Sequence, residues 1–173
     1  APLAGIDPDR LLAATGATAD GAWHLHRETQ SDDLDFFVLF SSFAAQLGTA
    51  AAGARATAGE FLNGLARHRR AAGLPATSVG WGPVERAGAA PRSDGQTGLT
   101  PAQVVAELGT LLHTRPVNVS IVDIDWQRWA QANPRLAQLP RFGSLVPSGE
   151  PDRAPAEPVR SKQETGRVLD AER

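Results

Sequence analysis

Three short stretches rich in apolar residues alternate with helical patterns along this chain, and the alternation limits the possible folds more than any other feature. Residues 36–40 form a continuous apolar run, which is typical of a strand buried on both faces of a sheet. Residues 77–81 and 117–122 are predicted to be the next two strands, with one helix in each of the two intervals. This order implies right-handed crossovers and therefore an α/β fold with a parallel sheet.

Sequence signals mark the ends of the helices. Asp7-Pro8 is expected to open the first helix as an N-cap followed by proline, and a second helical stretch is expected over 20–28. A long helix is predicted over 51–72, with Gly73 as its stop, and Thr100-Pro101 opens the last one. The side chains expected on the inner faces of these helices are Leu11, Leu12, Ala54, Ala58, Phe61, Leu62, Leu65, Val104, Val105, Leu108, Leu111 and Leu112. Three arginines in the last turns of the long helix, Arg67, Arg69 and Arg70, are expected to complement the helix dipole.

The chain divides into two regions of different composition. Residues 1–145 carry the periodic apolar pattern, whereas residues 146–173 are rich in proline and charge and are predicted to be an exposed linker. Three parallel strands leave one long edge of the sheet unpaired, and parallel sheets are normally completed and covered. The globular region is therefore expected to be the C-terminal half of a doubly wound domain, with the other half upstream.

Composition excludes several classes of function. A formal net charge of −2 offers no basic surface for nucleic acid or for an anionic membrane, and no apolar run is long enough to cross a bilayer. The chain has no cysteine, and its four histidines share no metal-ligand spacing, so no metal site is expected. It has no tyrosine, and its lysine, Lys162, lies in the tail. A cytoplasmic location is expected, and no mechanism that needs a phenol or a core lysine is open to this chain alone.

Six sequence blocks occur in one order and carry a family resemblance. They are DGAWHLH at 20–26, FVLFSS at 37–42, FL with LA at 61–66, HRRAAGLPAT at 68–77, WG at 81–82 and DIDW at 123–126. Together they resemble the C-terminal part of a ketoreductase domain of a modular type I polyketide synthase. The resemblance implies a Rossmann-like fold of the short-chain dehydrogenase/reductase type, in which a parallel sheet is flanked by helices.

Those ketoreductases reduce a β-keto group on an acyl carrier protein with NADPH, using serine, tyrosine, asparagine and lysine. Transferred residue by residue, the family serine falls on Ser42. The tyrosine position holds Arg55, the asparagine position Gly59 and the lysine position Thr18. Only the serine is retained, and we interpret it as vestigial.

These losses predict that the reduction is not carried out. A guanidinium effectively never gives up its proton, so Arg55 cannot replace a phenol as the acid. No Gly-x-Gly-x-x-Gly turn follows a predicted strand, so no cofactor is expected. The resemblance then implies a structural domain that scaffolds its neighbours in a polyketide synthase, with the 146–173 linker leading towards an acyl carrier protein.

Alternative interpretations stay open for the site and for the function. Ser42 is either a surviving hydrogen-bond donor or a strand-end hydroxyl that bonds the nearby backbone. Arg55 either fills the cleft or lies exposed on its helix; its register favours the cleft. The function is alternatively that of an NADPH-dependent β-ketoacyl reductase, or of a redox-silent epimerase, whose missing residues come from elsewhere.

Overall fold

The structure, a computed structural model, describes residues 7–47, 53–85, 94–146 and 169–170. Its elements follow one another as α1 (Pro8–Glu28), β1 (Val38–Ser42), α2 (Ala44–Leu47), α3 (Gly53–Ala71), β2 (Thr77–Trp81), β3 (Gln96–Thr97), α4 (Pro101–Thr114), β4 (Asn118–Ile121), β5 (Asp123–Ile124), α5 (Trp126–Ala132), α6 (Pro134–Ala137), a 3₁₀ turn (Pro140–Phe142) and β6 (Leu169–Asp170).

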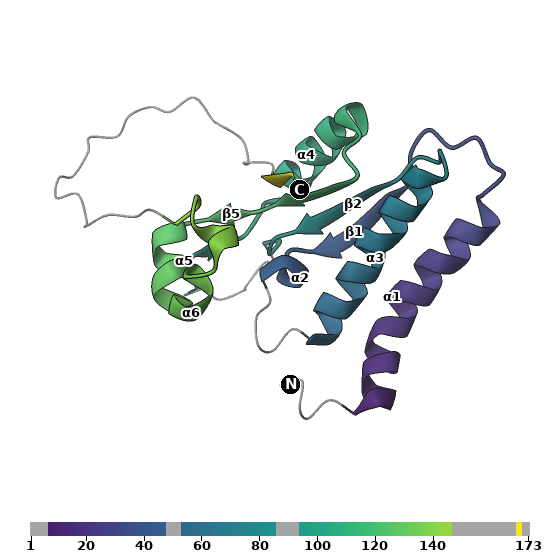
Figure 1. The fold of residues 1–173 in the computed structure, drawn as a ribbon. Coiled ribbons are helices and arrows are strands. Elements are labelled where there is room, and N and C mark those ends of the chain that lie inside the picture. The colour runs from purple at the N-terminus through teal and green to yellow at the C-terminus, as the bar shows by residue number, and fades with distance from the viewer. Residues whose placement is uncertain (1–6, 48–52, 86–93, 147–168, 171–173) are drawn as a thin grey trace.

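A four-stranded sheet forms the centre of the molecule (Figure 1). Strands β1, β2 and β4 lie side by side and are parallel, and β6 pairs with β4 in the antiparallel direction. β2 has the bounds that the sequence predicted, whereas β1 begins two residues later than its apolar run and extends to Ser42. The predicted parallel order is confirmed. A separate pair, β3 with β5, is antiparallel.

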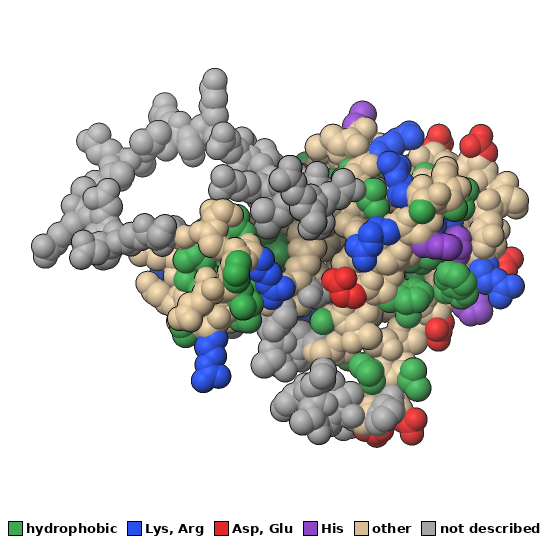
Figure 2. All heavy atoms as spheres, in the orientation of Figure 1, with side chains coloured by type: hydrophobic (Ala, Val, Ile, Leu, Met, Phe, Trp, Pro, Cys, Tyr) green, Lys and Arg blue, Asp and Glu red, His purple; other side chains and the backbone are tan. Residues whose placement is uncertain are grey.

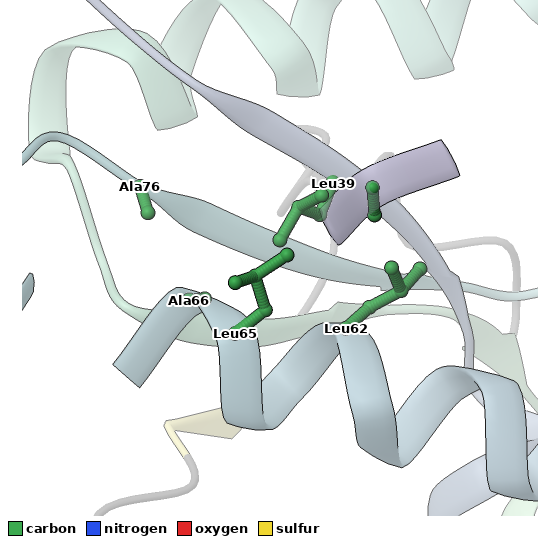
Figure 3. Close-up of a cluster of buried hydrophobic side chains, with 6 residues drawn as sticks. Leu39, Leu62, Leu65, Ala66 and Ala76 are labelled. Atoms are coloured by element: carbon green, nitrogen blue, oxygen red, sulfur yellow. The ribbon is translucent and has the colours of Figure 1, made fainter. Parts of the chain in front are cut away.

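Helices cover both faces of the sheet, as the predicted fold requires. On one face, α3 packs across β1 and β2, and α1 lies against the outer side of α3 (Figure 1). The core between α3 and the sheet contains Leu39 of β1 and Ala76 before β2, packed on Leu62, Leu65 and Ala66 of α3 (Figure 3).

The opposite face of the sheet is covered by α4. Val79 of β2 and Val119 of β4 are buried there beneath Leu111 of α4. A third cluster lies at the end of the sheet where α5 docks, and its centre is Trp129, which is fully buried beside Phe142.

The N-terminal region forms one helix rather than the two that the sequence predicted. Asp7 caps α1 as expected, since its side chain accepts a hydrogen bond from the backbone N–H of Asp9 at 3.0 Å. The helix continues through the glycines near its middle, and Thr15, Ala22 and His26 are buried on one of its faces.

Several apolar side chains predicted to face the core are exposed instead. They are Leu12, Phe61 and Val105 on the helices and Phe36 and Phe40 at β1. β1 is therefore not buried on both faces: it lies at the edge of the sheet, and Phe40 is 57% exposed. The other predicted helix positions are buried or half-buried, and polar side chains such as Thr15, Arg69 and Glu107 occupy the remaining part of the buried stripes.

The helix ends carry the predicted signals. Gly73 follows α3 with a φ of 78°, the left-handed conformation that glycine adopts without strain. Thr100 caps α4, and Gln103 completes a capping box with it. Among the described residues, no helix combines the length and apolar character needed to cross a membrane.

Candidate functional site

The candidate site lies at the carboxyl ends of β1 and β2, the place where parallel α/β sheets bind their ligands. Ser42 is the last residue of β1 and pairs in register with Trp81, the last residue of β2. The chain then turns sharply into α2, and the backbone N–H of Phe43 donates to the carbonyl of Trp81 at 3.0 Å. This hydrogen bond fixes the position of Ser42 relative to both strands.

Ser42 is half-buried, and its hydroxyl oxygen accepts a hydrogen bond from the backbone N–H of Ala44 at 3.3 Å. Such a contact two residues along the chain is the local serine turn that shapes a strand end. It agrees with the interpretation of Ser42 as a backbone-bonding hydroxyl. The contact uses an oxygen lone pair, so it leaves the hydroxyl hydrogen able to donate.

Arg55 lies in the first turn of α3, and its side chain is exposed. The first turn of α3 precedes the buried stripe that starts at Ala58, so Arg55 is not part of the packed face of the helix. Whether Arg55 faces a cleft stays a prediction.

Gly59 is buried on the side of α3 that faces β1. Its carbonyl accepts a hydrogen bond from the hydroxyl of Ser41 at 3.3 Å. The contact between strand and helix at this level is thus made by Ser41, the neighbour of the predicted site serine. Gly59 has no side chain with which to position a second group.

Thr18 lies on α1 and is exposed, whereas Thr15, one turn earlier, is buried. The buried face of α1 packs against α3, and Thr18 is not part of that face. No hydrogen bond among the described residues joins Thr18, Ser42 and Arg55.

Sequence reasoning missed a layer of polar contacts between the sheet and the helices beside it. Ser78 of β2 donates to the side-chain oxygen of Asn63 at 2.8 Å, and both residues are buried. Ser120 of β4, fully buried, donates to the side-chain oxygen of Gln46 in α2 at 2.6 Å. With Ser41, these serines share the α3-facing side of three strands. Their alternation with apolar neighbours in β2 and β4 is the sequence signal that could have located them.

A family model described as KR domain matches residues 1–86. These residues belong to the KR domain family. Polyketide synthase GfsA of Streptomyces halstedii is 35% identical over 177 residues, a match that covers 93% of this chain. Among solved structures, the first ketoreductase of the tylosin PKS aligns with a TM-score of 0.72 and 35% identity over 82% of this chain. An A1-type ketoreductase aligns with a TM-score of 0.74 and 32% identity over 85% of it.

The chain described here spans a small part of these relatives. It covers 2% of GfsA and 34% of each of the two ketoreductase structures. The predicted resemblance to polyketide synthase ketoreductases and the predicted Rossmann-like fold are confirmed by these matches.

Members of the KR family normally use NADPH, and among the described residues no glycine-rich turn joins a strand to a helix N-terminus. A dinucleotide needs a glycine-rich turn between a strand and a helix N-terminus. Here β1 is followed by the buried Phe43, and the lysine position is the exposed Thr18. The described residues contain no cluster of three or more histidine, aspartate or glutamate side chains suited to a metal ion.

Proposed function

We propose that this chain is part of a ketoreductase domain of a modular polyketide synthase that does not reduce its ketide and serves as a scaffold. The observation that carries the proposal is the exposed Arg55 at the position where the family has its tyrosine. Delivery of hydride to a ketone leaves an alkoxide, which must receive a proton from a positioned acid.

Arg55 is unsuited to that transfer. A guanidinium in a protein effectively never gives up its proton in the range in which enzymes work. Its exposure also places it in water, where its charge polarises a nearby carbonyl only weakly. Gly59 and Thr18 at the asparagine and lysine positions add neither a proton donor nor a cation.

The scaffold role is supported by the retained packing. The cores on both faces of the sheet are filled, while the exposed Phe36 and Phe40 lie at the open edge of β1. We infer that other parts of a larger synthase cover this edge, including an upstream half of the same domain. The 146–173 segment is proposed to lead to an acyl carrier protein. We propose in addition that the domain is cytoplasmic and that it binds no NADPH.

The test uses the complete synthase module that contains this chain. NADPH consumption is measured with a β-ketoacyl thioester as substrate, and no turnover above the rate without protein is expected. Ser42→Ala should leave this null result unchanged. Turnover that Ser42→Ala abolishes would overturn the proposal. Ser41→Ala is the matched control, because Ser41 bonds the carbonyl of Gly59.

The retained Ser42 favours a second candidate, a redox-silent epimerase. Its half-buried hydroxyl stands at the carboxyl end of the sheet, where a ketide α-carbon could approach. This activity would exchange an α-deuterium of a labelled ketide with solvent without consuming NADPH. Exchange that disappears in Ser42→Ala and persists in Ser41→Ala would support the epimerase over the scaffold.

A further inference from the structure

A cluster of basic and aromatic side chains joins the C-terminal ends of α1 and α3. Arg69 of α3 is fully buried, and its Nη1 donates to His26 Nδ1 on α1 at 3.2 Å. The same nitrogen lies 3.3 Å from the hydroxyl of Thr29, and Nε donates to the carbonyl of Pro75 at 3.1 Å. Arg69 thereby holds together α1, α3 and the segment that leads into β2.

Aromatic rings enclose this cluster. The guanidinium carbon of Arg69 lies 3.9 Å from the ring centre of Phe37. The His26 ring is 5.0 Å from Trp23 and 5.2 Å from His68, which meets it edge-on. In Figure 2, histidines (purple) lie beside hydrophobic side chains (green) on the face formed by α1 and α3.

The contact between Arg69 and His26 fixes where the imidazole carries its proton. A guanidinium has only donors, so His26 Nδ1 must accept and is unprotonated. An imidazolium carries a proton on both nitrogens. Protonation of His26 would therefore turn this hydrogen bond into a contact between two donors and two positive charges. Burial, followed by the charges of Arg69 and His68, lowers the pKa of His26.

The groups that face His26 offer no negative charge to compensate. They are Trp23 and Gln30 from its own segment, and His68 and Arg69 from α3. The adjoining charged residues of α1, Arg27 and Glu28, are exposed. One nitrogen of Arg69, Nη2, is buried and has no hydrogen-bond partner among the described residues. A second cation at His26 would thus be unpaired in a buried setting.

We propose that His26 and Arg69 form an acid-sensitive clasp that holds the C-terminal half of α1 on α3 at neutral pH and releases it on acidification. The clasp lies at the amino ends of the parallel strands, whereas Ser42 lies at their carboxyl ends. The inference is therefore independent of the proposed loss of reductase activity.

The free energy of unfolding depends on pH because the folded and unfolded chains bind a proton at His26 with different pKa values. The unfolded chain binds a proton at His26 with the ordinary pKa of about 6.5, and the folded chain binds it only at lower pH. Stability from the clasp is fully present above that value. It is lost as the pH falls from about 6.5 towards the folded-state pKa, with a slope of up to about tenfold in the unfolding constant per pH unit.

The experiment measures urea unfolding of the full 173-residue chain between pH 5.0 and 7.5. His26→Asn places an amide oxygen near the position of Nδ1 and does not titrate, so the wild-type slope below pH 6.5 should flatten. His24→Asn removes an exposed histidine of the same helix and should keep the wild-type slope. The proposal is overturned if His26→Asn keeps that slope.

Hydrogen exchange and NMR test the clasp in the wild-type chain, so the answer does not depend on folding of the variant. After correction for intrinsic rates, amides at 23–28 should exchange at least about fivefold faster at pH 5.5 than at pH 7.5, with smaller changes in β2. The His26 ring protons should titrate below pH 6.5. Equal acceleration in β2, or a titration midpoint at or above that value, overturns the proposal.

Discussion

The backbone of Gly95 lies in close contact with the backbone of the first turn of α5. Its φ is 75°, and its carbonyl accepts a hydrogen bond from the backbone N–H of Asp125 at 2.8 Å. A Cβ at this position would lie 2.5 Å from the backbone nitrogen of Trp129 and 2.8 Å from the carbonyl oxygen of Asp125. Both neighbours are backbone atoms, so neither can move aside without shifting α5.

Gly95→Ala is therefore expected to destabilise the chain by about 2–4 kcal/mol, through the steric contact and the left-handed backbone. Equilibrium urea unfolding measures the change in free energy. Gly64→Ala is the control, because a Cβ there meets nothing within 4 Å and α3 should gain up to about 1 kcal/mol. Equal effects of the two substitutions would contradict the steric argument.

Individual residues were predictable where a local signal exists. The N-caps Asp7 and Thr100 and the stop at Gly73 follow from their own neighbourhoods. Arg69 was expected to be one of several cations at a helix end, and its burial was not predicted. Its partner His26 lies 43 residues away, so no short window of sequence contains the contact.

The N-terminus of α4 carries a capping box formed by Thr100 and Gln103. The hydroxyl of Thr100 accepts from the backbone N–H of Gln103 at 3.2 Å, and the side-chain oxygen of Gln103 accepts from the backbone N–H of Thr100 at 2.8 Å. Pro101 occupies the first helical position, where its missing N–H is not needed.

Thr100→Ala should lower stability by about 1 kcal/mol, because the backbone N–H of Gln103 loses its side-chain acceptor and the Gln103 side chain loses the hydroxyl that donates to it. The change is measured as a shift in the urea midpoint with an unaltered slope. Thr110→Ala, at an exposed site on the same helix, should stay within about 0.5 kcal/mol of the wild-type chain. A larger loss from Thr110→Ala would show that the cap is not the decisive contact.

Whole elements were predicted where periodicity was strong. The alternation of strands and helices indicated β1, β2, β4, α3 and α4. The continuity of α1 was not predicted, since the sequence indicated one helix opened by Asp7-Pro8 and a second over 20–28, whereas one helix packs against α3. At the site, the sequence motif placed Ser42 at the end of a strand, where β1 ends. The exposure of Arg55 could not be predicted in the same way, because it depends on how the first turn of α3 packs against its neighbours.

At the scale of the whole molecule, β1 is an edge strand of the sheet that the described residues form, and aromatic side chains in and beside it are exposed. The side chains of Phe36, just before β1, and Phe40, in β1, are exposed, and the ring centre of Phe40 lies 5.7 Å from that of Trp81. Open edges with apolar side chains are the usual starting points for association between chains.

The isolated chain is expected to self-associate with rising concentration, and Phe40→Lys should reduce this association at least several-fold. Sedimentation velocity or light scattering measures it, while the free energy of unfolding should change by less than about 0.5 kcal/mol. Val105→Lys removes an exposed apolar side chain from α4 and serves as the control. Equal reductions by both variants would point to general solubility rather than to the β1 edge.

The three strand serines constrain how the helical layer meets the sheet. Ser41 bonds the Gly59 carbonyl, Ser78 bonds Asn63, and Ser120 bonds Gln46. A purely apolar contact tolerates a shift of the helix by one turn, because methyl groups can replace one another in such a contact. Each of these hydroxyls, in contrast, reaches its acceptor at only one position of the helix along the strands. A shift of α3 along the strands would break the Ser41–Gly59 and Ser78–Asn63 hydrogen bonds together. These two bonds therefore fix the position of the helix along the sheet.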